Sequence, residues 1–379
     1  MRIILAGCIG RFPLAGHGWI TSQYLLGLRS LGHEVYYLED AGEESWVYEW
    51  SRQELTNDIH YPADFVARTL DPIGMGGRWI YRTSDHAAGM SIDEFRDICQ
   101  SADLLLIRGA PLAVWRDEYS APLRRAFIDV DPLFTQVKTT QGDPQLKETL
   151  ERCEHVFTIA QRIGKVDCTI PLVKRKWHLT VSPVFLPAWQ VASEEPIHPF
   201  TTVMQWDSYD CVHYDGIAYG NKSHEFPRFT ALPRQTTAGF SIAMIGRPPG
   251  HLDIGGWQIV DGTTVSSTPE DYRTFIQKSF AEFSVAKQGY AASRGGWFSD
   301  RSACYLASGR PVVVQDTGLR DWLPIGRGVV CFQTVGEAVD AVTDVQRHYG
   351  EHRLAARRIA EEYFSTEQVL PPLIQQALS

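Results

Sequence analysis

The stretch from residue 293 to 319, SRGGWFSDRSACYLASGRPVVVQDTGL, constrains the fold more than any other part of the chain. Gly295 and Gly296 predict a tight turn, because glycine adopts backbone conformations that are closed to other residues. Ser299 or Asp300 is a natural N-cap for the helix that follows. The apolar run after that helix is typical of a central parallel strand, which is buried on both faces. The stretch therefore predicts a turn, a helix and a buried strand, in that order.

The same pattern favours an anionic ligand. Helix N-termini bind phosphates because their first backbone N–H groups have no partner within the helix. The turn at residues 295–296 and the helix start at residues 299–300 thus predict a nucleotide phosphate at the carboxyl edge of the sheet. Ordinary packing would give the same pattern, since it contains no diagnostic side chain. Arg294 and Arg301 flank the turn as candidate phosphate ligands or as solvated surface charges.

Length and charge limit the organisation and the partners. The chain of 379 residues exceeds what one hydrophobic core usually supports, so two domains are expected. Its formal net charge of -9 disfavours nucleic acid as the main partner and favours a small molecule. A local basic patch would not be visible in this total.

The cysteines and the apolar runs indicate the compartment. The 7 cysteines are scattered without a CxxC pair, so neither a disulfide framework nor a zinc site is expected. Reduced thiols are typical of a cytoplasmic protein. The start MRIILAG is typical of a strand before a glycine turn and lacks the features of a signal peptide. No apolar run approaches the roughly 18 residues of a membrane-spanning helix. We therefore expect a cytoplasmic protein with no membrane span.

Apolar periodicity predicts alternating strands and helices in the first half. A strand at residues 2–6, an amphipathic helix at residues 19–31 and a strand at residues 34–38 form a βαβ unit. Further strands are expected at residues 104–107, 126–129 and 156–159. The proline-rich segment 183–199 is typical of a linker.

The second half repeats this organisation, beginning with a strand at residues 240–245. Helices are predicted at residues 269–279 and 335–349, and strands at residues 282–286, 312–314 and 328–332. The fold class is therefore α/β, with two Rossmann-like doubly wound domains that face a central cleft. Ligands of such sheets bind beyond the carboxyl ends of the strands, so the expected site lies between the domains.

Three segments resemble nucleotide-sugar glycosyltransferases of the GT-B fold. They are GHGW at residues 16–19, LGLRSLGHEVYYLED at residues 26–40 and DRSACYLASGRPVVVQDTG at residues 300–318. The resemblance covers both halves of the chain. It implies an acceptor-binding domain over residues 1–190, a donor-binding domain over residues 191–365 and a C-terminal helix, 366–379, that returns to the first domain.

The resemblance also implies a general base. His17 lies where inverting members similar to this chain carry a catalytic histidine, and an imidazole accepts a proton near neutral pH. Asp40, Asp129 or Asp131 would orient it, and the sequence does not choose among them. The alternative is a histidine that hydrogen-bonds within its loop or binds a donor phosphate. The expected acceptor contacts are Gly16, Trp19, Asp129 and Asp131.

A leaving nucleoside diphosphate needs positive charge and backbone N–H groups around its oxygens. Arg247 and Lys287 follow predicted strands and would supply that charge at the carboxyl edge of the second sheet. The expected donor contacts are Arg247, Lys287, Arg294, Gly295, Gly296, Ser299, Asp300, Gln315 and Asp316.

The chain departs from the GT-B pattern at one position. Many GT-B enzymes bind the nucleotide ribose with a glutamate where this chain has Cys304. Asp300, one turn earlier on the same helix face, either substitutes for it or is only the N-cap. Gln315 and Asp316 partly match a pair that contacts sugar hydroxyls in the family.

Other patterns leave alternatives open. Asp129 and Asp131 would hold a divalent metal in a GT-A enzyme, but before a proline they fit a turn or acceptor contacts better. The aromatic segment 204–220 is an acceptor platform, or a loop that packs on its own domain or beside the donor base. The turn at residues 7–10 lacks the G-x-G-x-x-G spacing and disfavours a nicotinamide cofactor.

These features predict an inverting, metal-independent glycosyltransferase without a cofactor. Its donor is a nucleoside-diphosphate sugar, with UDP- and dTDP-sugars expected first, and its acceptor is a hydroxyl or an amine of a small molecule. A sugar-nucleotide epimerase of the same two-domain layout is the alternative enzyme. A nucleotide or sugar binding protein that closes on its ligand is the alternative without chemistry.

Overall fold

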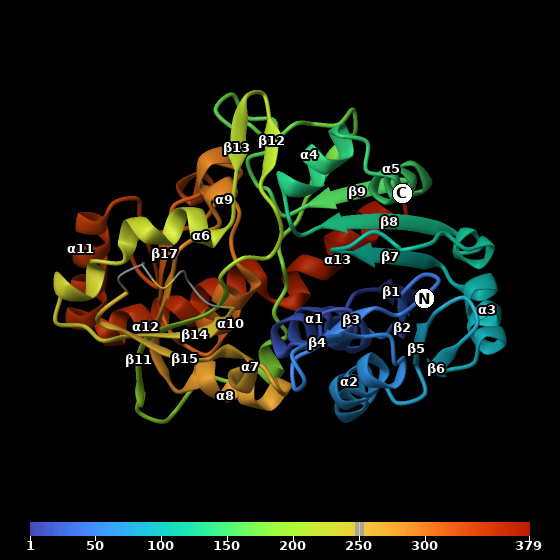
Figure 1. Ribbon diagram of the computed structural model, residues 1–379, viewed down its shortest axis with the longest axis horizontal. Helices are drawn as coiled ribbons and strands as arrows, with labels where there is room; N and C mark the ends of the chain where they lie inside the picture. The colour runs from blue at the N-terminus through green and yellow to red at the C-terminus, as the bar shows by residue number, and fades with distance from the viewer. Residues whose placement is uncertain (247–249, 251–253) are drawn as a thin grey trace.

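Two α/β domains lie side by side in the molecule (Figure 1). The computed structural model describes residues 1–246, 250 and 254–379. Each domain is built on its own parallel or mainly parallel sheet. The predicted α/β class with two Rossmann-like domains is therefore confirmed.

The first sheet has eight strands in the described part of the chain, in the order β10-β9-β8-β7-β1-β2-β5-β6, with only β6 antiparallel to its neighbour. The strands are β1 Arg2–Ala6, β2 Glu34–Asp40, β5 Trp79–Arg82, β6 Ala87–Gly89, β7 Leu104–Arg108, β8 Arg124–Asp129, β9 His155–Thr158 and β10 Trp177–Leu179. The hairpin is β3 Val47–Glu49 and β4 Glu54–Thr56, and the helices are α1 Ala15–Ser30, α2 His60–Leu70, α3 Ile92–Ser101, α4 Phe134–Thr140 and α5 Pro144–Arg152.

Strand β1 is apolar after Arg2 because helices cover both faces of this sheet. Ile3 and Leu5 pack in one core with Leu28 of α1. Ile4 packs in a second core on the opposite face, with Phe95 of α3. Continuous apolar runs are expected of strands that are buried in this way.

The second sheet has six strands among the described residues, all parallel, in the order β15-β14-β11-β16-β17-β18. The strands are β11 His198–Gln205, β14 Phe240–Ile245, β15 Trp257–Asp261, β16 Ser279–Ser284, β17 Val312–Gln315 and β18 Val329–Phe332. The hairpin is β12 Val212–Tyr214 and β13 Ile217–Tyr219, and the helices are α6 Lys222–Glu225, α7 Gly262–Val265, α8 Pro269–Gln277, α9 Gln288–Ser293, α10 Asp300–Ala307, α11 Val335–Arg347 and α12 Tyr349–Ile359.

The first strand of the second half is not the predicted one at residues 240–245, because β11 precedes it and lies at the centre of the sheet between β14 and β16. The sequence of β11, HPFTTVMQ, contains two threonines and directly follows the proline-rich segment, so its pattern is weak. The proline-rich segment is also packed, unlike a flexible linker. Its Val184 and Trp189 are fully buried in the core of the second domain.

The chain crosses between the domains twice, and the two crossings are hydrogen-bonded to each other. Val184 N donates to Phe364 O at 2.6 Å, and Thr366 N donates to Val184 O at 3.1 Å. Helix α13 (Thr366–Ala377) then returns to the first domain, where Leu370 joins its core beside α1. The C-terminus thus lies against the first domain (Figure 1).

Gly27 of α1 allows α13 to approach closely. A Cβ on Gly27 would lie 2.5 Å from Thr366 Cγ2 and 2.6 Å from Leu370 Cδ1. We expect Gly27→Ala to lower the free energy of unfolding by about 1–3 kcal/mol, the usual effect of overpacking, as measured by urea denaturation. Gly336→Ala in α11 is the matched control, because its Cβ would lie 4.0 Å from Thr334 Oγ1 and alanine favours a helix. Equal stability of the Gly27→Ala variant and the wild type would contradict the close contact.

Candidate functional site

The carboxyl ends of strands from both sheets meet where the domains touch. Strands β7 and β8 end at Arg108 and Asp129, and their arrowheads point toward the second domain (Figure 1). Lys287 follows β16 of the second sheet, and its Nζ lies 3.3 Å from Oδ1 of Asp131 in the first domain. We refer to this boundary, formed by Arg108, Asp131, Lys287 and the start of α10, as the interdomain seam.

Helix α1 brings His17 to the seam. The helix begins at Ala15 rather than at residue 19, so His17 lies in its first turn and not in a loop as predicted. The amide of Ala15 donates to Ser266 O of the second domain at 2.8 Å, which fixes the start of the helix against that domain.

The imidazole of His17 is half-buried and stacks on Phe12, with ring centroids 5.0 Å apart. Burial and, to a smaller extent, the positive charges of Arg108 and Lys287 together lower the pKa of His17 to about 4. Within the described residues no side chain hydrogen-bonds to this imidazole. His17 is therefore neutral at pH 7, and one of its two ring nitrogens is free to accept a proton.

None of the carboxylates predicted to orient His17 does so. Asp40 pairs with Arg116 at 2.6 Å. Asp129 is fully buried and accepts hydrogen bonds from Gln136 Nε2 at 2.7 Å and Thr158 Oγ1 at 2.8 Å. Asp129 thus stabilises the end of β8.

Asp131 holds the amine of Lys287 at the seam. Tyr209 donates to Asp131 Oδ2 at 2.6 Å, Lys287 Nζ donates to Tyr209 OH at 2.5 Å, and Tyr290 donates to Asp131 Oδ1. Burial lowers the pKa of Lys287, and the carboxylate of Asp131 acts in the opposite direction. Tyr209 comes from the aromatic segment 204–220, so that segment contributes one side chain to the seam and forms the hairpin β12–β13 with others.

The start of α10 reaches the same place. Ser299 is the N-cap, but its side chain makes no capping hydrogen bond. Burial raises the pKa of Asp300, and the positive charges of Arg301 and Arg108 oppose that rise. Arg301 itself is not a solvated surface charge. It turns into the second domain, where it bonds Glu282 Oε1 at 2.6 Å and Ser284 Oγ at 2.7 Å.

The glycine turn has a packing role in the structure, and its predicted phosphate contact stays a prediction. Gly295 and Gly296 are buried against the first domain, because a Cβ on Gly295 would lie 2.5 Å from Ile170 Cδ1 and one on Gly296 would lie 3.0 Å from Arg162 Cγ. The amide of Gly296 already donates to Thr317 O at 2.8 Å. Its φ of +74° still requires glycine, as the sequence indicated.

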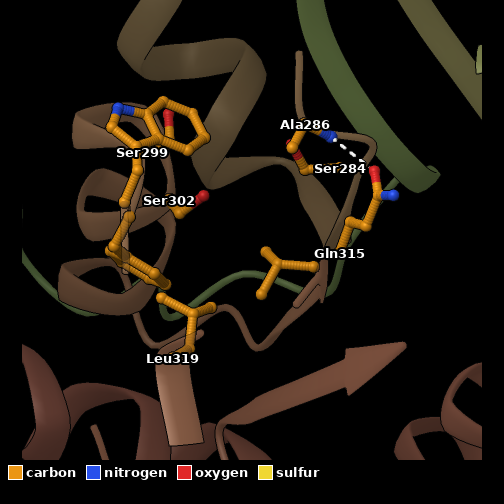
Figure 2. Close-up of a pocket in the computed structure, with 9 residues that line it drawn as sticks. Ser284, Ala286, Ser299, Ser302, Gln315 and Leu319 are labelled. Carbon is orange, nitrogen blue, oxygen red and sulfur yellow. Dashed lines mark hydrogen bonds between the residues drawn. The ribbon is translucent and has the colours of Figure 1, made fainter. Parts of the chain in front are cut away.

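Three further predicted donor contacts are engaged elsewhere. Gln315 accepts from Ala286 N at 3.1 Å, as Figure 2 shows, and donates to Glu225 at 2.6 Å. Asp316 accepts from the amides of Gly318 and Leu319 and so caps its own loop. Arg294 pairs with Asp167 of the first domain at 3.1 Å. In the structure these side chains stabilise loops and the domain contact, and their donor contacts stay predictions.

The predicted acceptor contacts Gly16 and Trp19 pack against the second domain. A Cβ on Gly16 would lie 3.7 Å from the ring of Tyr272, and Trp19 donates to Pro269 O at 2.6 Å. Cys304, at the position of the missing glutamate, is buried and accepts a weak hydrogen bond from Gln23 of α1 at 3.6 Å. The α1 helix thus covers that part of α10. The predicted donor residue Arg247 lies outside the described residues.

The sequence interpretation missed two buried cations, Lys222 and Arg108. Lys222 begins α6 and is 8% exposed, and among the described residues no hydrogen bond or ion pair engages its amine. Burial lowers its pKa well below the ordinary value, and the nearby positive charges of Arg301 and Lys287 act in the same direction. The signal in the sequence was an Asn-Lys pair after a glycine, which is typical of a short helix start in an α/β loop.

Two cavities lie near the seam. The first encloses about 10 Å³ between α10, β16 and β17, enough for one water molecule, and Ser284, Ser299, Ser302 and Leu319 are among its walls (Figure 2). The second has a volume of about 500 Å³ and lies beside the hairpin β12–β13. It is lined by Asp207, Ser208, Tyr209, Asp210, Cys211, Asn221, Ser223 and His224.

The two Rossmann-like domains joined at their strand ends define the GT-B fold. No family model matches the chain, and no curated protein sequence does. In the described part of the chain no cluster of side chains is suited to a metal ion, and no helix is long and apolar enough to cross a membrane.

Several solved structures share this fold over their full length. An alpha-glucosyltransferase in complex with UDP and a 13-mer DNA containing a central A:G mismatch is 10% identical, with a TM-score of 0.64 and coverage of 100% of both chains. Sucrose-phosphate synthase from Thermosynechococcus elongatus is 11% identical, with a TM-score of 0.52 and coverage of 99% of this chain and 98% of that one. AviGT4, a glycosyltransferase involved in avilamycin A biosynthesis, is 12% identical, with a TM-score of 0.54 and coverage of 100% of this chain and 97% of that one.

Proposed function

We propose that this protein is a glycosyltransferase that uses a nucleoside-diphosphate sugar. One observation carries the proposal: Lys222, a buried amine of the second domain, lies near Lys287, whose half-buried amine shares the seam with the uncapped start of α10 and with the neutral imidazole of His17. Amines and helix-terminal N–H groups recognise phosphate oxygens. The imidazole lies on the opposite domain, where an acceptor would meet the sugar.

The proposed reaction is a single displacement. A hydroxyl or amine of the acceptor attacks the anomeric carbon, His17 takes the proton, and the bond from that carbon to the diphosphate oxygen breaks, so that the diphosphate leaves with the electron pair. One displacement inverts the anomeric configuration. Lys222 and Lys287 face the charge that develops on the leaving oxygen, which supports a mechanism without a metal.

Binding of the donor also prepares the base. Arg108 and Lys287 lower the pKa of His17 in the free protein. A diphosphate beside these cations offsets their positive charge, so the pKa of His17 rises toward its ordinary value and the imidazole becomes a better proton acceptor. The diphosphate replaces Asp131 as the partner of Lys287. The carboxylate of Asp131 is then available to contact the acceptor. Ser299 and Asp300 remain proposed donor contacts at the start of α10.

The donor and acceptor classes follow from similar structures and from charge. Similar structures hold UDP or UDP-glucose, which supports a UDP- or dTDP-sugar as the donor. Some also hold DNA. Because this chain has a net charge of -9, we propose a small-molecule acceptor in the cytoplasm instead. The proposed donor-binding and acceptor-binding domains span residues 191–365 and 1–190.

A thermal-shift comparison of UDP, dTDP and uridine tests the donor. A ligand that binds only the folded protein raises its melting temperature, and the difference between UDP and uridine isolates the diphosphate. We expect UDP or dTDP to stabilise the protein more than the nucleoside does. Equal shifts for UDP and uridine would contradict a diphosphate site. Sugar release without an acceptor would indicate an epimerase, and binding without turnover would indicate a binding protein.

We expect Lys287→Met to weaken UDP binding at least tenfold while uridine binding is unchanged, because one charge-assisted contact contributes about 1.5–3 kcal/mol. Isothermal titration calorimetry measures both affinities. Lys278→Met is the matched control, because Lys278 lies at the amino end of β16, away from the seam. A Lys287→Met variant that binds UDP as tightly as the Lys278→Met variant would remove Lys287 from the proposed site.

A further inference from the structure

Arg108 is a buried arginine without an acceptor for its N–H groups. It ends strand β7 and is 2% exposed. No hydrogen bond or ion pair joins its guanidinium to any residue that the structure describes, and its Nε is fully enclosed without a partner. Its contact is the face of Tyr24, with the guanidinium carbon 5.8 Å from the ring centroid. The hydroxyl of Tyr24 is also buried, and no described residue hydrogen-bonds to it.

Such a site is costly unless an anion completes it. Taking a charged group out of water without a partner costs several kcal/mol, so buried charges are normally paired. The same sheet shows the usual arrangement. Arg82 ends β5, is also 2% exposed, and pairs with Glu118 at 2.6 Å. Arg108 lacks this kind of internal carboxylate partner.

The surroundings of Arg108 place it at the seam between the domains. Its charge acts on His17 of α1 and on Asp300 of α10, the second of which belongs to the other domain. Asp300 forms no ion pair with Arg108 in the described residues, so the two opposite charges are near each other without touching. Asp300 therefore makes no direct contact with the guanidinium, and an oxyanion that enters the seam would meet it beside the imidazole of His17.

We propose that Arg108 binds an oxyanion, a phosphate or a carboxylate group, of a molecule that the two domains enclose together. A guanidinium binds such a group through two parallel N–H donors, which an amine cannot do. The anion is either the diphosphate of the donor or an acidic group of the acceptor. The identity of the bound molecule rests on the proposed function. The existence of an anion site at Arg108 does not depend on it.

The test compares Arg108→Met with Arg82→Met in the full chain by thermal shift. In the absence of ligands we expect Arg108→Met to melt at the same temperature as the wild type or higher, because it removes an uncompensated charge. Arg82→Met should melt at a clearly lower temperature, because it removes the 2.6 Å partner of Glu118 and leaves that carboxylate only the longer 3.8 Å pair with Arg96. The probes are UDP, uridine and inorganic phosphate, the last also added on top of saturating UDP.

Each outcome decides the proposal. In the wild type, UDP should raise the melting temperature more than uridine does. If Arg108→Met loses this difference and Arg82→Met keeps it, the anion is the donor diphosphate. If Arg108→Met keeps this difference but phosphate added to the UDP-saturated variant no longer raises its melting temperature, the anion is a separate acidic group. If Arg108→Met keeps both shifts, the proposal is wrong. If wild-type protein responds to phosphate but not to UDP, the glycosyltransferase proposal fails and the anion site stands. Arg108→Lys, which keeps the charge but not the paired donors, should give an intermediate shift.

Discussion

Replacing His17 with alanine is expected to lower sugar transfer by at least about a hundredfold, the effect of losing a general base. The imidazole is suited to this role because it is neutral at pH 7 and its side chain is not hydrogen-bonded to any described residue. Initial rates of UDP release with an acceptor measure the loss. His213→Ala is the matched control, since His213 is an exposed residue of the β12–β13 hairpin.

The affinity for UDP separates a base from a donor ligand. His17→Ala should bind UDP about as tightly as the wild type, because the proposed phosphate contacts are the two lysines and the start of α10. NMR titration of His17 should give a pKa of about 4 without ligand and a higher value with UDP bound. The imidazole of the free protein therefore loses its capacity as a base only when the pH falls toward 4. Normal turnover in His17→Ala, or turnover that falls only through weaker UDP binding, would refute the base role.

Arg301→Met is expected to lower the free energy of unfolding by about 3–5 kcal/mol, because it leaves a buried carboxylate without its partner. Glu282 is fully buried, and its Oε2 already has no hydrogen-bond partner. Equilibrium unfolding in urea measures the loss. The double variant Arg301→Met with Glu282→Leu should recover much of it, since an apolar pair of similar volume avoids the buried charge.

An exposed ion pair provides the comparison. Arg327 pairs with Asp344 at 2.7 Å and with Glu351 at 3.1 Å, and its side chain is 45% exposed. Arg327→Met should therefore change the stability by no more than about 1 kcal/mol. If Arg301→Met and Arg327→Met lose the same free energy of unfolding, burial does not determine how much the Arg301–Glu282 pair contributes to stability.

The fold could be predicted from the sequence because its central strands are unbroken apolar runs. The predicted strands at residues 2–6 and 240–245 coincide with β1 and β14. Strand β11 was missed because its threonines and the prolines before it weaken the apolar pattern, although it lies at the centre of its sheet. The start of α1 was misplaced because a hydrogen bond from the other domain sets it, and such a contact leaves no local signal.

The site was less predictable, because glycines and polar residues in loops serve packing and ligand binding equally well. Gly295 and Gly296 suited a phosphate turn, yet Ile170 and Arg162 of the other domain cover them. Arg108 ends an apolar strand and looked like an ordinary strand end. Only the three-dimensional structure shows that this guanidinium has no carboxylate partner, since pairing depends on residues that are distant in the sequence.

The double crossing of the chain restricts how the two halves can move. Val184 and Thr366 are linked by a backbone hydrogen bond, so both connections pass through one point. Sliding of one half past the other would break these bonds, whereas rotation about that point preserves them. Any opening between the two halves should thus be a rotation about this point, and α13, which packs on α1, should move together with the first half.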